Sequence, residues 1–309
     1  MESQEAHRQN RRLRTSLMFC TLMFAMTIPT SAADEPEKST DRATLLQVFH
    51  KEFVPINVGT KEFPATFLMG TNDGQPAEAP PHKVTIARPF SIAKYEVPQN
   101  LYAAVMGSNP SRWQGPRNSA ERMSWIDAIA FCEKVTTLLR EQKLIDETQV
   151  VRLPTEAEWE YACRAGTTTA YSFGDMAQQP GDIGNKASLL DPYAWHTGNA
   201  AGNDPEVGVL KPNPWGLYDM HGYLSEFTVD RWHDNYAPAS NITPPTDGSA
   251  WETPKLPIAA GSEIPQCVLR GGSWKHNHLD LRSTSRQPLP ITSKSDAIGL
   301  RCVLTASNQ

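Results

Sequence analysis

The chain has 309 residues, of which 39% are hydrophobic and 20% are charged, with a formal net charge of −5 at pH 7. These values are ordinary for a globular protein, and the acidic balance argues against a nucleic-acid-binding function. The 25 prolines and 8 tryptophans favour a compact, loop-rich fold over a helical bundle, because proline lacks a backbone N–H and breaks helices.

Residues 1–33 have the features of a secretory signal peptide. Basic residues at 11–14 precede an apolar run of 13 residues at 16–28, and small residues follow. A membrane span needs about twenty apolar residues, so cleavage after Ala32 or Ala33 is the favoured interpretation, and an uncleaved anchor is the alternative. We therefore expect a secreted or periplasmic protein with no membrane span after signal cleavage.

The pattern after the signal peptide predicts a single α+β domain. A polar linker at residues 34–44 leads into a short helix, and the domain extends over residues 45–306. Short alternating apolar runs, separated by glycine and proline, predict strands at residues 53–59, 63–70 and 82–97.

Helices are expected in the next part of the chain. Apolar residues recur at helical spacing in residues 97–107 and 124–144. A third helix fits residues 155–166, because Thr155 is a good N-cap residue and Glu158 completes a capping box.

The second half of the domain has little regular pattern. Residues 167–265 are rich in Gly, Asn, Pro and Trp, and loops of this length need order from packing, disulfides or bound ions. Two further strands are expected within residues 268–274 and 298–304.

Nine motifs occur in an order that resembles one protein family. They are FLMG at 67–70, HKVTI at 82–86, FSIAKYEV at 90–97, MGSNPS at 106–111, SWIDAIAFC at 124–132, RLPTEAEWEYACRAGT at 152–167, KPNPWGLYDMHG at 211–222, RGGSW at 270–274 and GLRCV at 299–303. Together they resemble the sulfatase-modifying-factor, or formylglycine-generating-enzyme-like, family across about residues 45–306. The resemblance implies a C-type-lectin-like core with little regular secondary structure, long ordered loops and, in many members, bound calcium.

The resemblance also implies a chemistry that this chain does not fully match. The family's oxidases use copper, held by two cysteine thiolates, and oxygen to convert a sulfatase cysteine to formylglycine; copper(I) prefers such soft ligands. Counted from the GGSW motif, the two cysteine positions fall on His276 and Leu281, and no cysteine occurs between Cys267 and Cys302. We therefore expect a bacterial, exported family member that does not bind copper and does not make formylglycine.

Such a pseudoenzyme is expected to act as a binding module. The resemblance places Ser273 and Arg286 along the family's groove. With Trp274 and His276 nearby, this groove would receive an extracellular or periplasmic peptide, protein or glycan. The alternative is an active oxidase, either of the formylglycine-generating type or with another metal, that acts on a protein or peptide.

One further metal site is suggested by the spacing of His276, His278 and Asp280. On a strand, alternating side chains share one face, so these three could form a two-His-one-carboxylate site. The competing interpretation is a polar strip that faces solvent.

Calcium is suggested by oxygen-rich residues in the irregular region. Calcium takes six to eight oxygen ligands, many from loop carbonyls, and Asn199 and Glu226 are candidate ligands. In the segment where the family usually has GNVWEW, this chain has GYLSEF, so Tyr223 replaces the asparagine and weakens one family calcium site. Turn capping is the alternative role for these residues.

Four cysteines follow the signal peptide, and an even number in an oxidising compartment suggests two disulfides. The resemblance implies a Cys132–Cys302 bridge between the SWIDAIAFC and GLRC motifs. Cys163 and Cys267 would then form the second bridge, although Cys267 matches no family disulfide position.

Overall fold

The computed structural model describes residues 41–307, except 202–203, 239–241 and 260. The expected signal peptide and the linker up to residue 40 lie outside the described residues. The described part contains no helix that is long and apolar enough to cross a membrane.

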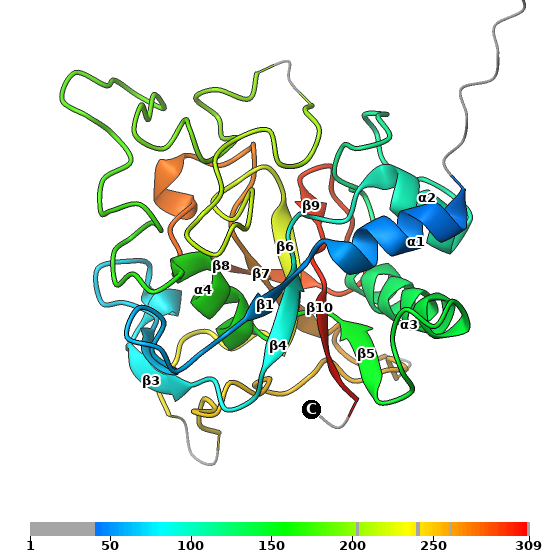
Figure 1. Cartoon of the computed structure of the whole chain (residues 1–309). Coiled ribbons are helices and arrows are strands. Elements are labelled where there is room, and N and C mark those ends of the chain that lie inside the picture. The colour runs from blue at the N-terminus through cyan, green and yellow to red at the C-terminus, as the bar shows by residue number, and fades with distance from the viewer. Residues whose placement is uncertain (1–40, 202–203, 239–241, 260, 308–309) are drawn as a thin grey trace, which may run out of the picture. The chain divides into compact units, whose positions relative to one another are not determined.

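Helices, short 3₁₀ turns and strands make up a small part of the domain, and long loops connect them (Figure 1). This confirms the expected α+β class with little regular secondary structure. The elements are α1 (Arg42–Lys51), β1 (Phe53–Ile56), β2 (Thr66–Met69), η1 (Pro76–Glu78), β3 (His82–Thr85), β4 (Phe90–Ala93), α2 (Gln99–Met106), α3 (Trp125–Glu141), β5 (Gln149–Arg152), α4 (Glu156–Arg164), β6 (Ser225–Arg231), β7 (Gln266–Arg270), η2 (His278–Asp280), β8 (Arg286–Pro290), β9 (Ile298–Gly299) and β10 (Val303–Ala306).

The first sheet has the strand order β1-β4-β10-β5, and its strands pair antiparallel. Helix α3 packs against β5, while α1, α2 and α3 pack against one another, and Figure 1 shows the three helices gathered beside β5 and β10. Ser124 caps α3 in a reciprocal capping box with Asp127, which satisfies backbone donors that the first turn leaves free. The apolar faces of these helices and the sheet form the largest core cluster.

The second sheet has the order β8-β7-β6-β9, with β9 parallel to β6. A separate hairpin joins β2 and β3. Helix α4 contacts β2, β6 and β7, and all nine of its residues are buried, including Glu156, Glu158, Glu160 and Arg164. Buried charges are tolerated only when they are paired and hydrogen-bonded, so this helix must find ionic partners inside the domain.

Those partners form an alternating row of buried charges. The Arg164 guanidinium lies 2.9 Å from Glu160, which also contacts Arg270. Arg270 lies 3.6 Å from Glu156, which in turn pairs with Arg286 at 2.7 Å. This row joins α4 to β7 and β8 and fixes the segment that follows β7.

The predictions from sequence are most accurate where they rest on residues close together in the chain. Thr155 caps α4 and forms the expected capping box with Glu158. The run at residues 82–97 forms two strands, β3 and β4, because residues 86–89 leave the ladder. Strand β6, in the region expected to be irregular, was not predicted.

Candidate functional site

The GGSW segment follows β7 as a tight turn at the centre of the domain. Gly271 and Gly272 have φ of 85° and 68°, values that only glycine adopts readily. A Cβ on Gly272 would lie 2.7 Å from the Asp280 carbonyl oxygen. The two glycines therefore let the chain reverse directly against the η2 turn.

His276, which the resemblance places at the first family cysteine position, is hydrogen-bonded within its own turn. Its Nδ1 accepts from the Ser273 amide at 3.0 Å and lies 2.8 Å from Ser273 Oγ. Its Nε2 lies 3.4 Å from Gln287 Nε2. Burial lowers the pKa of His276 below its ordinary value, so a neutral imidazole, not a thiolate, occupies this position.

Leu281, which the resemblance places at the second family cysteine position, belongs to the core. It is fully buried in a small cluster with Tyr171, Leu190 and Ala194. An aliphatic side chain in this environment has no donor atom for a metal or for oxygen chemistry. The pair of positions therefore provides one neutral histidine and one hydrocarbon.

The strand expected for His276, His278 and Asp280 is wrong. Residues His278–Asp280 form a 3₁₀ turn, so the three side chains do not alternate onto one face. Among the described residues, no group of three or more His, Cys, Asp or Glu side chains is placed to hold a metal ion.

The expected groove residues separate into buried and accessible members. Ser273 is fully buried, and Arg286 is buried between Glu156 and the rings of Trp232 and Tyr236. Arg286 therefore does not line a groove, contrary to the prediction. Trp274 is partly exposed, and its Nε1 donates to the Asp296 carbonyl at 3.1 Å.

An open cleft lies beside this segment instead. It has a volume of about 410 Å³, and we call it the Arg282 cleft. Its walls come from parts of the chain far apart in sequence: Leu68, Gly70, Thr71, Asn72, Asp73, Pro81, Arg164, Thr168, Thr169, Ala170, Asp175, Arg282 and Thr284.

The two arginines of the Arg282 cleft are already neutralised. Arg282 forms a two-point ion pair with Glu78, at 2.6 and 2.7 Å, and Arg164 pairs with Glu160. Asp73 and Asp175, by contrast, are exposed at the surface of the cleft. Neither of these two aspartates was predicted from the sequence to be a site residue.

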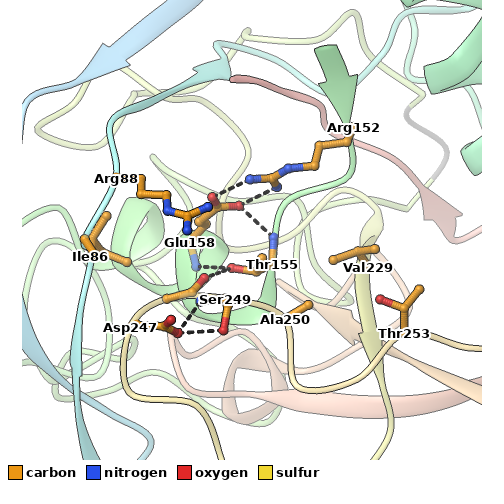
Figure 2. A pocket seen from close by; sticks show the side chains of 12 residues that line it. Ile86, Arg88, Arg152, Thr155, Glu158, Val229, Asp247, Ser249, Ala250 and Thr253 are labelled. Carbon is orange, nitrogen blue, oxygen red and sulfur yellow. Dashed lines mark hydrogen bonds and ion pairs between the residues drawn. The ribbon is translucent and has the colours of Figure 1, made fainter. Parts of the chain in front are cut away.

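A second cavity, of about 220 Å³, lies at the start of α4 (Figure 2). Figure 2 shows Glu158 held by Arg152, with both contacts at 2.7 Å, and by the Thr155 amide at 2.8 Å. On the opposite wall Asp247 accepts from Ser249 Oγ at 2.6 Å. Thr155 Oγ1 donates to the Gly248 carbonyl at 2.9 Å, which joins the start of α4 to the loop at residues 247–253 and gives the cavity a structural role.

The expected calcium ligands do not fit the structure. The Glu226 carboxylate accepts from Arg301, at 2.8 and 3.0 Å, and from Trp159 Nε1 at 2.7 Å. Asn199 caps a turn, with Oδ1 accepting from the His196 amide and Nδ2 donating to the Ala194 carbonyl, both at 2.9 Å. The side-chain oxygens of Glu226 and Asn199 are therefore engaged by other partners, and bound calcium stays a prediction.

Tyr223, at the position where the resemblance expects an asparagine, forms hydrogen bonds with three partners through its phenol oxygen. Its phenol oxygen lies 2.6 Å from the Pro205 carbonyl and 3.2 Å from Asp204 Oδ1, and it accepts from the Ser119 amide at 3.2 Å. Asn118 Nδ2 also donates to Asp204 Oδ2 at 2.6 Å. The Asp204 carboxylate and the Tyr223 phenol oxygen thus receive hydrogen bonds from N–H and O–H donors. A cation at this position would have to compete with these donors for the same oxygens.

The cysteines behave differently from one another. Cys132 and Cys302 are thiols whose sulfurs lie 3.9 Å apart, so the expected partners are neighbours, and their bridge stays a prediction. Cys163 contacts His221 and lies in a core cluster with Trp159 and Met220. Cys267 lies in the largest core cluster and donates to the Leu289 carbonyl. The structure places Cys163 and Cys267 in different core clusters as free thiols, and it therefore gives no support to the predicted Cys163–Cys267 bridge.

The fold and the GGSW turn define a C-type-lectin-like domain of the formylglycine-generating type. The chain belongs to the sulfatase-modifying factor enzyme 1-like domain family, whose model matches residues 51–306. The structure of PvdO from Pseudomonas aeruginosa is similar, with a TM-score of 0.60 and 29% identity, covering 81% of this chain and 97% of PvdO.

Two curated relatives show how functions divide within the family. The formylglycine-generating enzyme of Mycobacterium tuberculosis is 34% identical over 160 residues, which cover 49% of this chain and 50% of that protein. The inactive C-alpha-formylglycine-generating enzyme 2 of Mus musculus is 27% identical over 303 residues, with 78% and 83% coverage. This chain spans about half, 49–53%, of the formylglycine-generating enzymes that it matches.

Proposed function

We propose that the chain is an exported binding module of its family and does not generate formylglycine. The observation that carries this proposal is the chemistry of the two family cysteine positions. His276 is a neutral imidazole hydrogen-bonded to Ser273, and Leu281 is buried hydrocarbon. Copper(I) held by two thiolates has no counterpart in this pair.

The ligand of this module is a polypeptide segment with a basic side chain, bound in the Arg282 cleft. Asp73 and Asp175 place two exposed carboxylates there, while Arg282 and Arg164 have their own carboxylate partners. The cleft therefore favours a cation. Two hydroxyls in its walls, those of Thr71 and the exposed Thr168, are suited to donate hydrogen bonds to a peptide backbone.

Titration calorimetry of the full chain with a capped Cys-x-Pro-x-Arg peptide tests the binding. A matched peptide with alanine in place of arginine should bind about tenfold more weakly, as expected for the loss of one partly desolvated charge contact. Asp73→Asn should reduce affinity for the arginine peptide to a similar degree. Asp247→Asn, which removes a carboxylate from the other cavity, should leave the affinity unchanged.

The alternative function is an active oxidase, and family membership favours it. The same peptide separates the two functions, because an oxidase would convert its cysteine to an aldehyde in the presence of copper and oxygen. Equal affinity for the arginine and alanine peptides would contradict the role given to Asp73 and Asp175.

A further inference from the structure

Two cation–aromatic pairs share one carboxylate on the surface beside the GGSW turn. The Arg112 guanidinium lies 4.6 Å from the centre of the Trp113 ring, and Lys275 Nζ lies 4.9 Å from the Trp274 ring. Asp296 joins the pairs, since it contacts Arg112 Nη1 at 3.1 Å and also Lys275. We call these five residues the Trp113–Trp274 surface.

The cations of this surface are accessible to a ligand. The side chains of Arg112 and Lys275 are 56% and 44% exposed, whereas Asp296 is 13% exposed. Trp113 is 46% exposed, which is high for a tryptophan that has no ligand. The exposed Arg122 donates its amide to the Ser295 carbonyl next to Asp296. The patch is therefore cationic on a chain whose net charge is −5.

The backbone of this surface has little to offer a peptide. Glu121 Oε1 accepts from the amides of Arg112 and Trp113. The Trp274 amide donates to the Tyr223 carbonyl, and the Lys275 amide donates to Ser273 Oγ. A bound strand would find these N–H groups occupied, so recognition here has to proceed through side chains.

The loop that carries Trp113 is held in place by the buried carboxyl group of Glu121. Glu121 is 3% exposed, its Oε1 is bound to the loop amides, and its Oε2 is a buried atom with no hydrogen-bond partner. Trp274 is anchored in turn by its Nε1 bond to the Asp296 carbonyl. The Trp274 indole and the backbone that carries Trp113 are thus preorganised, which reduces the entropy lost on binding.

We propose that the Trp113–Trp274 surface binds a carboxylated polysaccharide. Flat apolar faces suit the C–H faces of pyranose rings, and the adjacent cations suit the carboxylates of uronic acid units. The exposed Arg112 and Lys275 also attract such a polymer to this surface, although the chain as a whole has a net negative charge. The binding is independent of the Arg282 cleft, whose ligand is a cation.

Titration of the full chain with a galacturonate hexasaccharide tests this assignment, with a neutral galactose hexasaccharide and hexaglutamate as comparison ligands. We expect binding of the uronate and at least about tenfold weaker binding of the other two. Trp113→Ala and Lys275→Gln should each weaken uronate binding about fivefold to tenfold, through loss of ring contact and of charge.

Lys211→Gln is the matched control, because Lys211 also lies over an aromatic ring, that of Tyr193, on another surface. It should leave the uronate affinity unchanged. Absence of uronate binding, or equal binding of the neutral sugar, would overturn the proposal. Equal binding of hexaglutamate that is insensitive to Trp113→Ala would also overturn it and would assign the patch to acidic peptides. None of these outcomes alters the test of the Arg282 cleft.

Discussion

Arg301 holds Glu226 by a two-point ion pair in the fully buried centre of the domain. The guanidinium nitrogens lie 2.8–3.0 Å from the carboxylate oxygens, and Arg301 also donates to the Ala93 and Tyr218 carbonyls. The pair joins β6 to the segment before β10 and brings the ends of the two sheets together. Glu226 therefore serves the architecture, although the sequence suggested a calcium ligand.

Glu226→Gln should destabilise the domain by about 3–5 kcal/mol, because it removes the ion-pair partner of the buried Arg301 charge. Urea unfolding followed by tryptophan fluorescence measures the change. Glu252→Gln is the control, since its pair with Arg231 is exposed at 45% and 53% and should contribute less than about 1 kcal/mol. Equal effects of the two substitutions would contradict the structural role of Glu226.

Tyr223→Phe should destabilise the domain by about 1–3 kcal/mol, because it leaves the buried Ser119 amide without its acceptor. The unfolding temperature of the native chain should be unaffected by calcium or by a chelator. Differential scanning calorimetry in the two conditions provides the measurement. A rise in the unfolding temperature with calcium would show that cation binding, which the phenol is argued to replace, persists.

His221 should make stability depend on pH. It is fully buried, with Nδ1 donating to the Leu281 carbonyl and Nε2 accepting from the Ser172 amide, and burial lowers its pKa to about 4 from 6.5. Between these values the unfolded chain binds the proton and the folded chain does not, so stability falls as the pH decreases from 6.5 to 4. The full effect is on the order of 3 kcal/mol.

His221→Gln should remove this part of the pH dependence, as measured by urea unfolding across that range. His50→Gln on α1 should preserve it. A His221→Gln variant with the same pH profile as the native chain would refute the assignment.

Cys132 and Cys302 should form a disulfide when the chain is exposed to an oxidising compartment. The bridge would close a loop of 170 residues, for which the chain-entropy estimate is about 5 kcal/mol. Peptide mapping without reduction should recover the two cysteines in one cross-linked fragment. Cys163 and Cys267 should be recovered as free thiols, and a Cys163–Cys267 fragment would contradict the structure.

Local sequence signals account for the helices well. The capping boxes of α3 and α4 lie within four residues, and the structure contains both. Strand β6 was missed because most of its side chains are buried on both faces, so the polar–apolar alternation of a half-exposed strand is absent. Glu226 of this strand pairs with Arg301, 75 residues away in the chain. A pattern of neighbouring residues cannot reveal such a distant partner.

The candidate site was predictable only where the family motif defines it. The loss of both cysteines at His276 and Leu281 can be read directly from the residue types. The burial of Arg286 cannot, because it depends on Glu156, 130 residues earlier in the chain. The Arg282 cleft is likewise assembled from loops that no spacing rule relates.

The most direct test of the account is incubation of the full chain with copper, oxygen and the capped Cys-x-Pro-x-Arg peptide, followed by mass spectrometry of the peptide. An active family oxidase serves as the positive control under the same conditions. We expect the peptide to bind and its cysteine to be recovered unchanged. Conversion of the cysteine to the aldehyde would contradict the account, because it would show that His276 and Leu281 do not abolish the oxidase chemistry.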